Sequence, residues 1–285
     1  MIRSTRIDAH QHFWRLARGD YRWLSPTLGP LWRDFEPEDL EPLLERHGIA
    51  GTIAVQAADT LAESLHLLDL GTRRDWILGV VGWVDLLAMD APAQLASRAR
   101  DPWYKGVRPM LQDIPDVDWM LQPALAPALR ALVAHDLAFD ALVRPAHLPN
   151  LRVLLLRHPD LRVVIDHGAK PDIAGGDLAR WREDIASIAR ETRASCKLSG
   201  LVTEAATDWQ PHDIAPVVAH LLDVFGPERL LWGSDWPVLL LAADHERWCA
   251  LTDALLARCT APERDAIMGG NAMRFYRLSA PGAQG

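Results

Sequence analysis

Residues 7–14 read IDAHQHFW and place Asp8, His10 and His12 on alternate positions of an apolar run. In a β-strand, alternate side chains point to the same face. We therefore expect the three polar side chains to share one face of a buried strand, with both histidines toward its C-terminal end. Two imidazoles at that spacing predict a functional site, where they would either ligate a divalent metal ion or donate hydrogen bonds to a substrate carbonyl.

Seven further apolar, β-prone runs follow, separated by longer amphipathic stretches. The eight expected strands cover residues 6–13, 51–57, 77–84, 106–110, 138–143, 162–166, 194–198 and 230–234. Strands that alternate with helices are typical of repeated βα units around a parallel sheet. Eight such units in 285 residues predict a single α/β domain, a (β/α)8 TIM barrel, over residues 1–278, rather than an open doubly wound sheet. Residues 279–285 are expected to form a frayed C-terminal tail.

The net charge is −8, and no cluster of Lys and Arg is present. A nucleic-acid surface needs a basic face, so the expected partner is a small molecule. The cysteines, Cys196, Cys249 and Cys259, are widely spaced, which predicts buried thiols rather than disulfides or a thiolate zinc site. The opening residues, MIRSTR, contain no secretory signal, and no apolar run reaches the length of a membrane span. We expect a cytoplasmic enzyme or binding protein.

Polar residues also follow two other predicted strands. The run VVIDHGAKP ends its strand with Asp166 and His167, and LLWGSDWP ends another with Asp235. The connections 14–35 and 111–122 are unusually long and follow the C-terminal ends of the first and fourth strands. Barrel enzymes place their sites at this end of the strands, so we expect these residues and loops to form one site.

Six segments, taken in order, span nearly the whole chain: DAHQHFW, GVVGWVDL, YKGVRPMLQD, VVIDHGAKP, CKLSGL and WGSDWPV. Together they resemble the amidohydrolase superfamily, in particular its branch of TIM-barrel sugar lactonases, which includes L-fuconolactonase and L-rhamnonolactonase. The resemblance implies that His10 and His12 form the first-strand HxH motif and that His167 is the histidine of the sixth strand. It also implies that Asp235, after the eighth strand, is the general base that acts on water.

The sequence departs from the two-metal members of that superfamily. The fifth strand offers Asp140 without a histidine, and the fourth-strand segment points to Arg108 rather than to a bridging lysine. We therefore do not expect a binuclear centre. One divalent ion such as Zn²⁺ could be held by four residues, His10, His12, His167 and Asp235. Because a lactone is an activated ester, an Asp carboxylate can assist water directly, so no cofactor is strictly required.

The expected substrate contacts are polar or flat side chains near strand ends: Arg108, Gln56, Trp83, Asp140 and Trp236. The guanidinium of Arg108 would bind a substrate oxygen or form a surface ion pair. The side chain of Gln56 would donate a hydrogen bond to a sugar hydroxyl or form a hydrogen bond with the backbone. The two tryptophans, with Trp14 and Trp23, would stack on a sugar ring or pack in the core. Lys170 and Lys197 are interpreted as structural.

We predict a hydrolase that opens a sugar (aldono) lactone, such as L-fuconolactone or L-rhamnonolactone, to the aldonic acid by Asp-assisted attack of water. The alternative is a zinc-dependent decarboxylase of the same superfamily that acts on an aromatic or muconate-type acid. A third hypothesis is a barrel that binds a sugar acid without turning it over. The sequence leaves open which sugar, ring size and stereochemistry the protein accepts, and which oligomer it forms.

Overall fold

The computed structural model describes residues 6–279. Eight parallel strands form one sheet in chain order, and the predicted single-domain (β/α)8 barrel is confirmed. The strands are β1 (Arg6–Gln11), β2 (Ile49–Val55), β3 (Ile77–Gly82), β4 (Tyr104–Val107), β5 (Ala138–Ala141), β6 (Val163–Ile165), β7 (Ser195–Leu198) and β8 (Leu230–Trp232). All but the first residue of the predicted tail, 279–285, lies outside the described residues.

The barrel closes between the segments that follow β8 and β1. The backbone N–H of Asp235 donates to the carbonyl of His10 at 2.8 Å, and the N–H of His12 donates to the carbonyl of Trp236 at 2.7 Å. These backbone bonds place the Asp235 segment beside the HxH segment, although more than 220 residues separate them along the chain.

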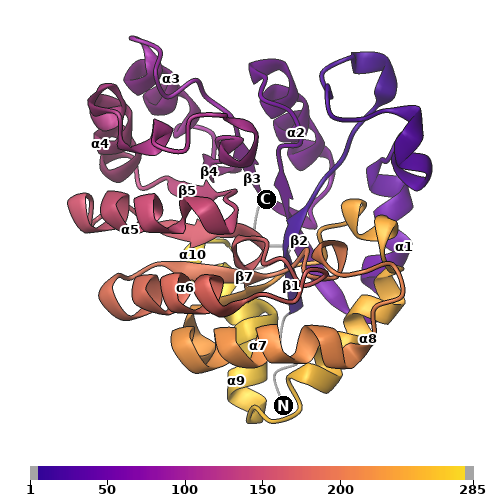
Figure 1. Cartoon of the computed structure of the whole chain (residues 1–285). Coiled ribbons are helices and arrows are strands. Elements are labelled where there is room, and N and C mark those ends of the chain that lie inside the picture. Colours follow the sequence, from indigo (N-terminus) through magenta and orange to yellow (C-terminus); the bar gives the residue numbers. More distant parts are fainter. Residues whose placement is uncertain (1–5, 280–285) are drawn as a thin grey trace.

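The helices surround the sheet in chain order (Figure 1). They are α1 (Pro37–His47), α2 (Leu61–Arg73), α3 (Ala91–Arg98), α4 (Ala126–Ala134), α5 (Leu148–Arg157), α6 (Ala179–Glu191), α7 (Pro211–Phe225), α8 (His245–Leu255), α9 (Ala261–Asp265) and α10 (Asn271–Phe275). Within residues 6–279, no helix is both long enough and apolar enough to cross a bilayer.

Local signals explain where the two helices that flank the closure begin and end. At the start of α1, the Asp39 carboxylate accepts the backbone N–H of Glu36 at 2.9 Å. The helix ends at Gly48, whose φ of +62° is a left-handed cap that glycine adopts without a steric penalty. At the start of α8, the Asp244 carboxylate accepts the backbone N–H of Arg247 at 2.7 Å. The helices α1 and α8 pack side by side (Figure 1).

Two apolar layers make up the core. The larger layer fills the space between the sheet and the helices. The smaller one lies inside the barrel and includes Ile7, Ala9 and the C-terminal Tyr276. The C-terminal segment contacts β1 and β8, and the amide of Asn271 donates to the carbonyl of Leu230 at 2.6 Å. Residues 271–278 therefore plug the barrel from the side opposite the strand C-termini.

The expectation that Asp8 shares a face with the two histidines is wrong. Ile7 and Ala9 belong to the inner layer, so Asp8 between them faces the other side of the strand. The register of β1 against β2 shifts between Asp8 and Gln11, and this irregularity returns His10 to the barrel interior. The Asp8 carboxylate instead accepts the backbone N–H groups of Ser234 at 2.8 Å and of His10 at 3.1 Å. It thus stabilises the closure of the barrel.

The long connection 14–35 folds over the strand C-termini through aromatic contacts. Trp14 makes edge-on contacts with Trp23 and with Phe35, at 5.4 and 5.2 Å between ring centroids. Phe35 in turn meets Trp236 at 5.3 Å. Such edge-to-face pairs hold a loop in one orientation. The loop after β1 is therefore anchored to the segment that carries Asp235.

Candidate active site

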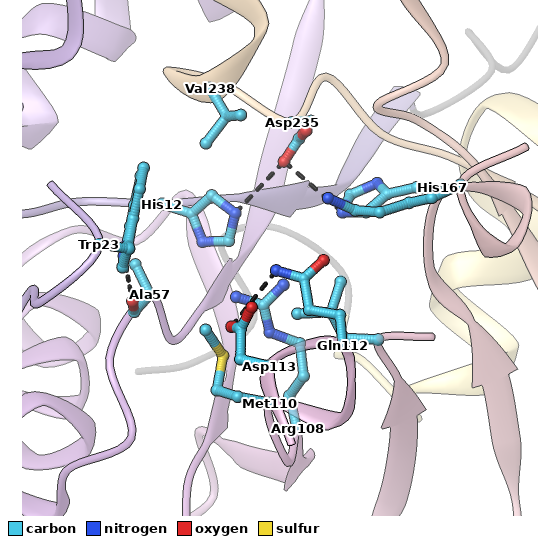
Figure 2. Close-up of a pocket in the computed structure, with 12 residues that line it drawn as sticks. His12, Trp23, Ala57, Arg108, Met110, Gln112, Asp113, His167, Asp235 and Val238 are labelled. Carbon is cyan, nitrogen blue, oxygen red and sulfur yellow. Dashed lines mark hydrogen bonds and ion pairs between the residues drawn. The ribbon is translucent and has the colours of Figure 1, made fainter. Parts of the chain in front are cut away.

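A cavity opens at the C-terminal ends of the strands, where the sequence predicts the site (Figure 2). Its volume is about 150 Å³, whereas a single water needs only about 10–15 Å³. The cavity therefore has room for a small molecule. The lining residues are His12, Trp23, Ala57, Arg108, Met110, Gln112, Asp113, Leu142, His167, Lys170, Asp235 and Val238.

Three imidazoles converge on one carboxylate oxygen of Asp235. The Nε2 atom of His12 lies 3.3 Å from Asp235 Oδ1, and the Nε2 atoms of His10 and His167 each lie 3.8 Å from it. Figure 2 shows Asp235 between His12 and His167 at the wall of the cavity. The structure thus brings together all four residues that the sequence predicts as catalytic.

The hydrogen-bond partner of Nδ1 in His12 and in His167 influences whether the Nε2 atom, which faces Asp235, carries a proton. His12 Nδ1 lies 2.7 Å from the carbonyl of Val55. Because a carbonyl only accepts, Nδ1 carries the proton, and Nε2 of neutral His12 presents a lone pair toward Asp235. His167 Nδ1 pairs with the hydroxyl of Ser199 at 2.9 Å. Because a hydroxyl can donate or accept, His167 Nε2 carries a proton into the cavity when Nδ1 accepts, and it offers a lone pair to a metal ion when Nδ1 donates.

Burial and neighbouring charges shift the ionisation of these groups. Burial opposes a charge on Asp235, but the surrounding imidazoles, His167 foremost, outweigh it and lower the pKa of this carboxyl. Burial lowers the pKa of His167 to about 4 and also lowers the pKa values of His10 and His12. Near neutral pH, the cavity therefore holds an ionised Asp235 among neutral imidazoles, and this carboxylate is free to accept a hydrogen bond or a proton.

Left-handed backbone positions aim two of these side chains. His167 has φ +54° and Asp235 has φ +58°, both in a region that non-glycine residues rarely adopt. The turn after β6 continues through Gly168 with a third positive φ, and the indole N–H of Trp181 donates to its carbonyl at 2.7 Å. Strained positions of this kind cluster at functional sites, where surrounding structure holds them.

Glycine is required where β7 ends. Gly200 has φ +59°, and a Cβ at this position would lie 2.5 Å from His167 Nδ1 and 3.0 Å from Asp235 Oδ2. Real side chains do not approach so closely, so only glycine lets the backbone pass behind His167 and Asp235. Gly200 was not predicted as a site residue, although it lies within the segment CKLSGL, which resembles the lactonase branch.

Arg108 and Gln56 bind each other across the floor of the cavity. The amide nitrogen of Gln56 donates to the carbonyl of Arg108 at 2.5 Å, and the guanidinium donates back to the carbonyl of Gln56. Arg108 lines the cavity with its Nη1 atom 3.4 Å from His10 Nε2. Gln56 is buried beneath it, and its predicted contact with substrate stays a prediction.

Lys197, interpreted from the sequence as structural, lies in a buried network of charged groups. Its ammonium is fully buried and lies 2.6 Å from Asp140 Oδ2, 3.0 Å from Asp166 Oδ1 and 3.0 Å from His10 Nδ1. Burial alone would raise the pKa of Asp166, but Lys197 and His10 hold it well below its ordinary value. A lysine in the middle of a buried strand is rare unless it is paired, and that rarity is the signal that could have identified it.

The other predicted contacts lie around the cavity rather than in its wall. Asp140 is fully buried beneath it, where its carboxylate accepts from Lys197 and from the hydroxyl of Tyr276, each at 2.6 Å. Trp83 and Trp236 are not among the lining residues, and Trp236 is buried against Phe35. Their roles in substrate binding stay predictions.

Trp23 is the tryptophan that lines the cavity. It comes from the long connection after β1, and its indole N–H donates to the carbonyl of Ala57 at 2.7 Å (Figure 2). This bond fixes the ring at the wall, where its flat face can contact an apolar face of a ligand.

Three of the four predicted ligands, His10, His12 and Asp235, form a candidate group for a single divalent ion. Donor atoms of His10, His12 and Asp235 lie within 4.8 Å of one another, and the Nε2 atom of His167 points at the same carboxylate oxygen. The carbonyl of Val55 orients His12 as the outer partner of a ligating histidine commonly does. Imidazole and carboxylate donors suit zinc and similar transition metals.

The sequence pattern of the amidohydrolase family matches residues 7–278. The chain belongs to this family. An L-fucono-1,5-lactonase of Burkholderia ambifaria is 49% identical over 280 residues, which cover 97% of each chain. An L-fucono-1,5-lactonase of Burkholderia multivorans is 40% identical over 98% of each chain.

A solved amidohydrolase from Burkholderia multivorans superposes on this family member with a TM-score of 0.92 at 38% identity, covering 96% of this chain and 100% of that one. That structure contains bound zinc. Two solved decarboxylases superpose at only 13 and 14% identity, so their likeness shows a shared fold alone.

Proposed function

We propose that this amidohydrolase hydrolyses a sugar lactone, with L-fuconolactone and L-rhamnonolactone as leading candidates, to the open aldonic acid. The observation that carries the proposal is the ionised Asp235 surrounded by imidazoles in a small-molecule cavity. The identity of 49% to an L-fucono-1,5-lactonase over nearly the full chain supports this substrate class. A cytoplasmic location remains part of the proposal.

In the proposed reaction, Asp235 and His12 position the attacking water. Asp235 Oδ1 and the lone pair of His12 Nε2 are both acceptors, so one water can donate a hydrogen to each. As the water oxygen attacks the lactone carbonyl carbon, Asp235 takes a proton from it. The negative charge that develops on the carbonyl oxygen is stabilised by the Arg108 guanidinium and by Nε2–H of His167.

The second step opens the ring. When the tetrahedral intermediate collapses, the bond between the carbonyl carbon and the ring oxygen breaks. The proton held by Asp235 then passes to the departing ring oxygen, which becomes a free hydroxyl, and the new carboxylic acid loses the second water proton to solvent to give the carboxylate. This transfer returns Asp235 to its ionised form, which is the form favoured by its lowered pKa.

Metal use is also a proposal. His10, His12, His167 and Asp235 would hold one divalent ion, and such an ion would supply Lewis-acid polarisation of the carbonyl. Because the lactone is an activated ester and Arg108 already lies in the cavity, we propose that the ion is not strictly required. Hydrolysis should therefore persist after the protein is stripped with a chelator and assayed in metal-free buffer.

Replacing the base tests the proposal directly. We expect Asp235→Asn to abolish lactone hydrolysis, because an amide cannot take the proton from water, while circular dichroism and the melting temperature stay close to those of the wild type. A panel of aldonolactones of both ring sizes, followed by NMR, measures turnover. Asp244→Asn is the matched control, since Asp244 caps α8 through a backbone N–H and asparagine also caps well. Near-normal turnover by Asp235→Asn would overturn the assignment.

The same measurements separate the alternatives. Complete loss of activity on metal removal, together with release of CO₂ from an aromatic or muconate-type acid, would support the decarboxylase. Tight binding of a sugar acid without turnover of any lactone would support a binding protein. Neither alternative has a close relative among the proteins compared above.

A further inference from the structure

A second cluster of metal-ligating side chains lies outside the barrel, away from the cavity. His47 is the last residue of α1, and His245 is the first residue of α8. Cys249 follows one helical turn after His245, so both side chains lie on the same face of α8. One donor atom from each of the three residues lies within 4.8 Å of the other two.

The contacts of these side chains leave donor atoms unused. The Nδ1 atom of His245 meets Cys249 Sγ at 3.5 Å, and the rings of His47 and His245 lie 5.0 Å apart between centroids. The Nε2 atoms of both histidines are buried and have no hydrogen-bond partner within residues 6–279. His245 and Cys249 are each only 2% exposed, and a buried polar atom without a partner is costly.

We propose that His47, His245 and Cys249 form a second metal site, for a zinc-type divalent ion, that joins α1 to α8, the α-helices that follow β1 and β8. Two imidazoles and a thiolate are a donor set for zinc or cobalt, whereas magnesium and calcium prefer oxygen ligands. His47 is only half-buried, so water can reach the site and supply a fourth ligand. Binding displaces the thiol proton of Cys249 to solvent.

The position of the site gives it a structural role. Nearly 200 residues lie between His47 and His245, and they include most of the barrel. A bound ion would hold α1 against α8 where the ends of the sheet meet (Figure 1). Because the unfolded chain does not bring these ligands together, binding would stabilise the folded protein. This role does not depend on the proposed lactonase activity.

Cobalt distinguishes this site from the catalytic cavity, because a thiolate bound to Co²⁺ absorbs in the near ultraviolet and no cysteine lines the cavity. The full-length protein is titrated with CoCl₂ in metal-free buffer. We expect the thiolate-to-cobalt band to appear in the wild type, to be lost in Cys249→Ser, and to be displaced by an equal amount of ZnCl₂. Cys259→Ser is the matched control, and it should retain the band because Cys259 belongs to no such cluster within residues 6–279.

A second variant keeps the test decisive if Cys249→Ser folds poorly. His47→Gln alters a half-buried side chain at the end of a helix and leaves the cysteine in place. At the cobalt concentration that saturates the wild type, we expect this variant to lose the band. Absence of the band in the wild type, or its persistence in either variant, would overturn the proposal.

Discussion

At the scale of single residues, the ionisation of Asp235 and His167 predicts the pH dependence of the reaction. Asp235 has a lowered pKa and stays ionised as the pH falls, and His167, with a pKa of about 4, stays neutral. We therefore expect kcat/KM for lactone hydrolysis to change by less than about twofold from pH 7 to about pH 5. NMR detection of the aldonic acid measures it without a pH indicator. A decline centred near 6.5 would show instead that an imidazole with an ordinary pKa controls the rate.

Asp8 provides the control for that profile. Burial raises its pKa to about 6, so its carboxylate takes up a proton within the same interval. It bonds to the backbone N–H groups of Ser234 and His10 rather than facing the cavity. If a decline near pH 6 is present in the wild type but absent in Asp8→Asn, it belongs to this backbone contact and not to the catalytic group.

The residues that could be predicted are those whose chemistry is unusual for their position. His10 lies near the end of an apolar strand, and His12, His167 and Asp235 follow the ends of strands. Their convergence follows from the common end of parallel strands. Asp8 was predicted to lie on the wrong face of the strand, because the register shift in β1 cannot be recognised from an alternating sequence pattern. The role of Lys197 depends on contacts with three other strands, and no local pattern encodes such contacts.

At the scale of elements, the short turn after β7 determines the catalytic geometry. We expect Gly200→Ala to reduce kcat/KM by on the order of 100-fold, because the new methyl group would displace His167 and Asp235 and small misplacements are costly. Gly176→Ala is the matched control, since Gly176 has φ +76° and open space around its Cβ position. Both variants should lose about 1–2 kcal/mol of stability to left-handed strain. Equal activity of the two variants would contradict this role for Gly200.

The elements themselves were largely predictable. Each of the eight expected strands overlaps an observed one, because apolar runs bounded by polar turns are strong signals. Several expected strands, such as 77–84 and 138–143, run past the observed C-terminal ends. At those ends the chain leaves the sheet to build the cavity, and this departure depends on the closed barrel rather than on local sequence. The left-handed turn at His167 could not be predicted from the sequence either, because only one of its residues is glycine.

At the scale of the whole molecule, a buried polar chain connects the C-terminal plug to the catalytic floor. The hydroxyl of Tyr276 donates to Asp140, whose carboxylate also accepts from Lys197. Lys197 in turn contacts His10 in the barrel interior. The C-terminal plug therefore does more than fill space, since Tyr276 hydrogen-bonds the carboxylate that pairs with Lys197, and Lys197 contacts the imidazole of His10.

This connection predicts a difference between two buried tyrosines. Tyr276→Phe removes a hydroxyl that donates to a buried carboxylate, and we expect the free energy of unfolding to fall by about 1.5–3 kcal/mol. Tyr104 is equally buried, but its hydroxyl has no hydrogen-bond partner within residues 6–279. Tyr104→Phe should therefore leave stability unchanged or raise it slightly. Urea unfolding curves with equal m values measure both changes. If the two variants lose the same stability, the C-terminal plug acts through packing alone and the polar chain adds nothing.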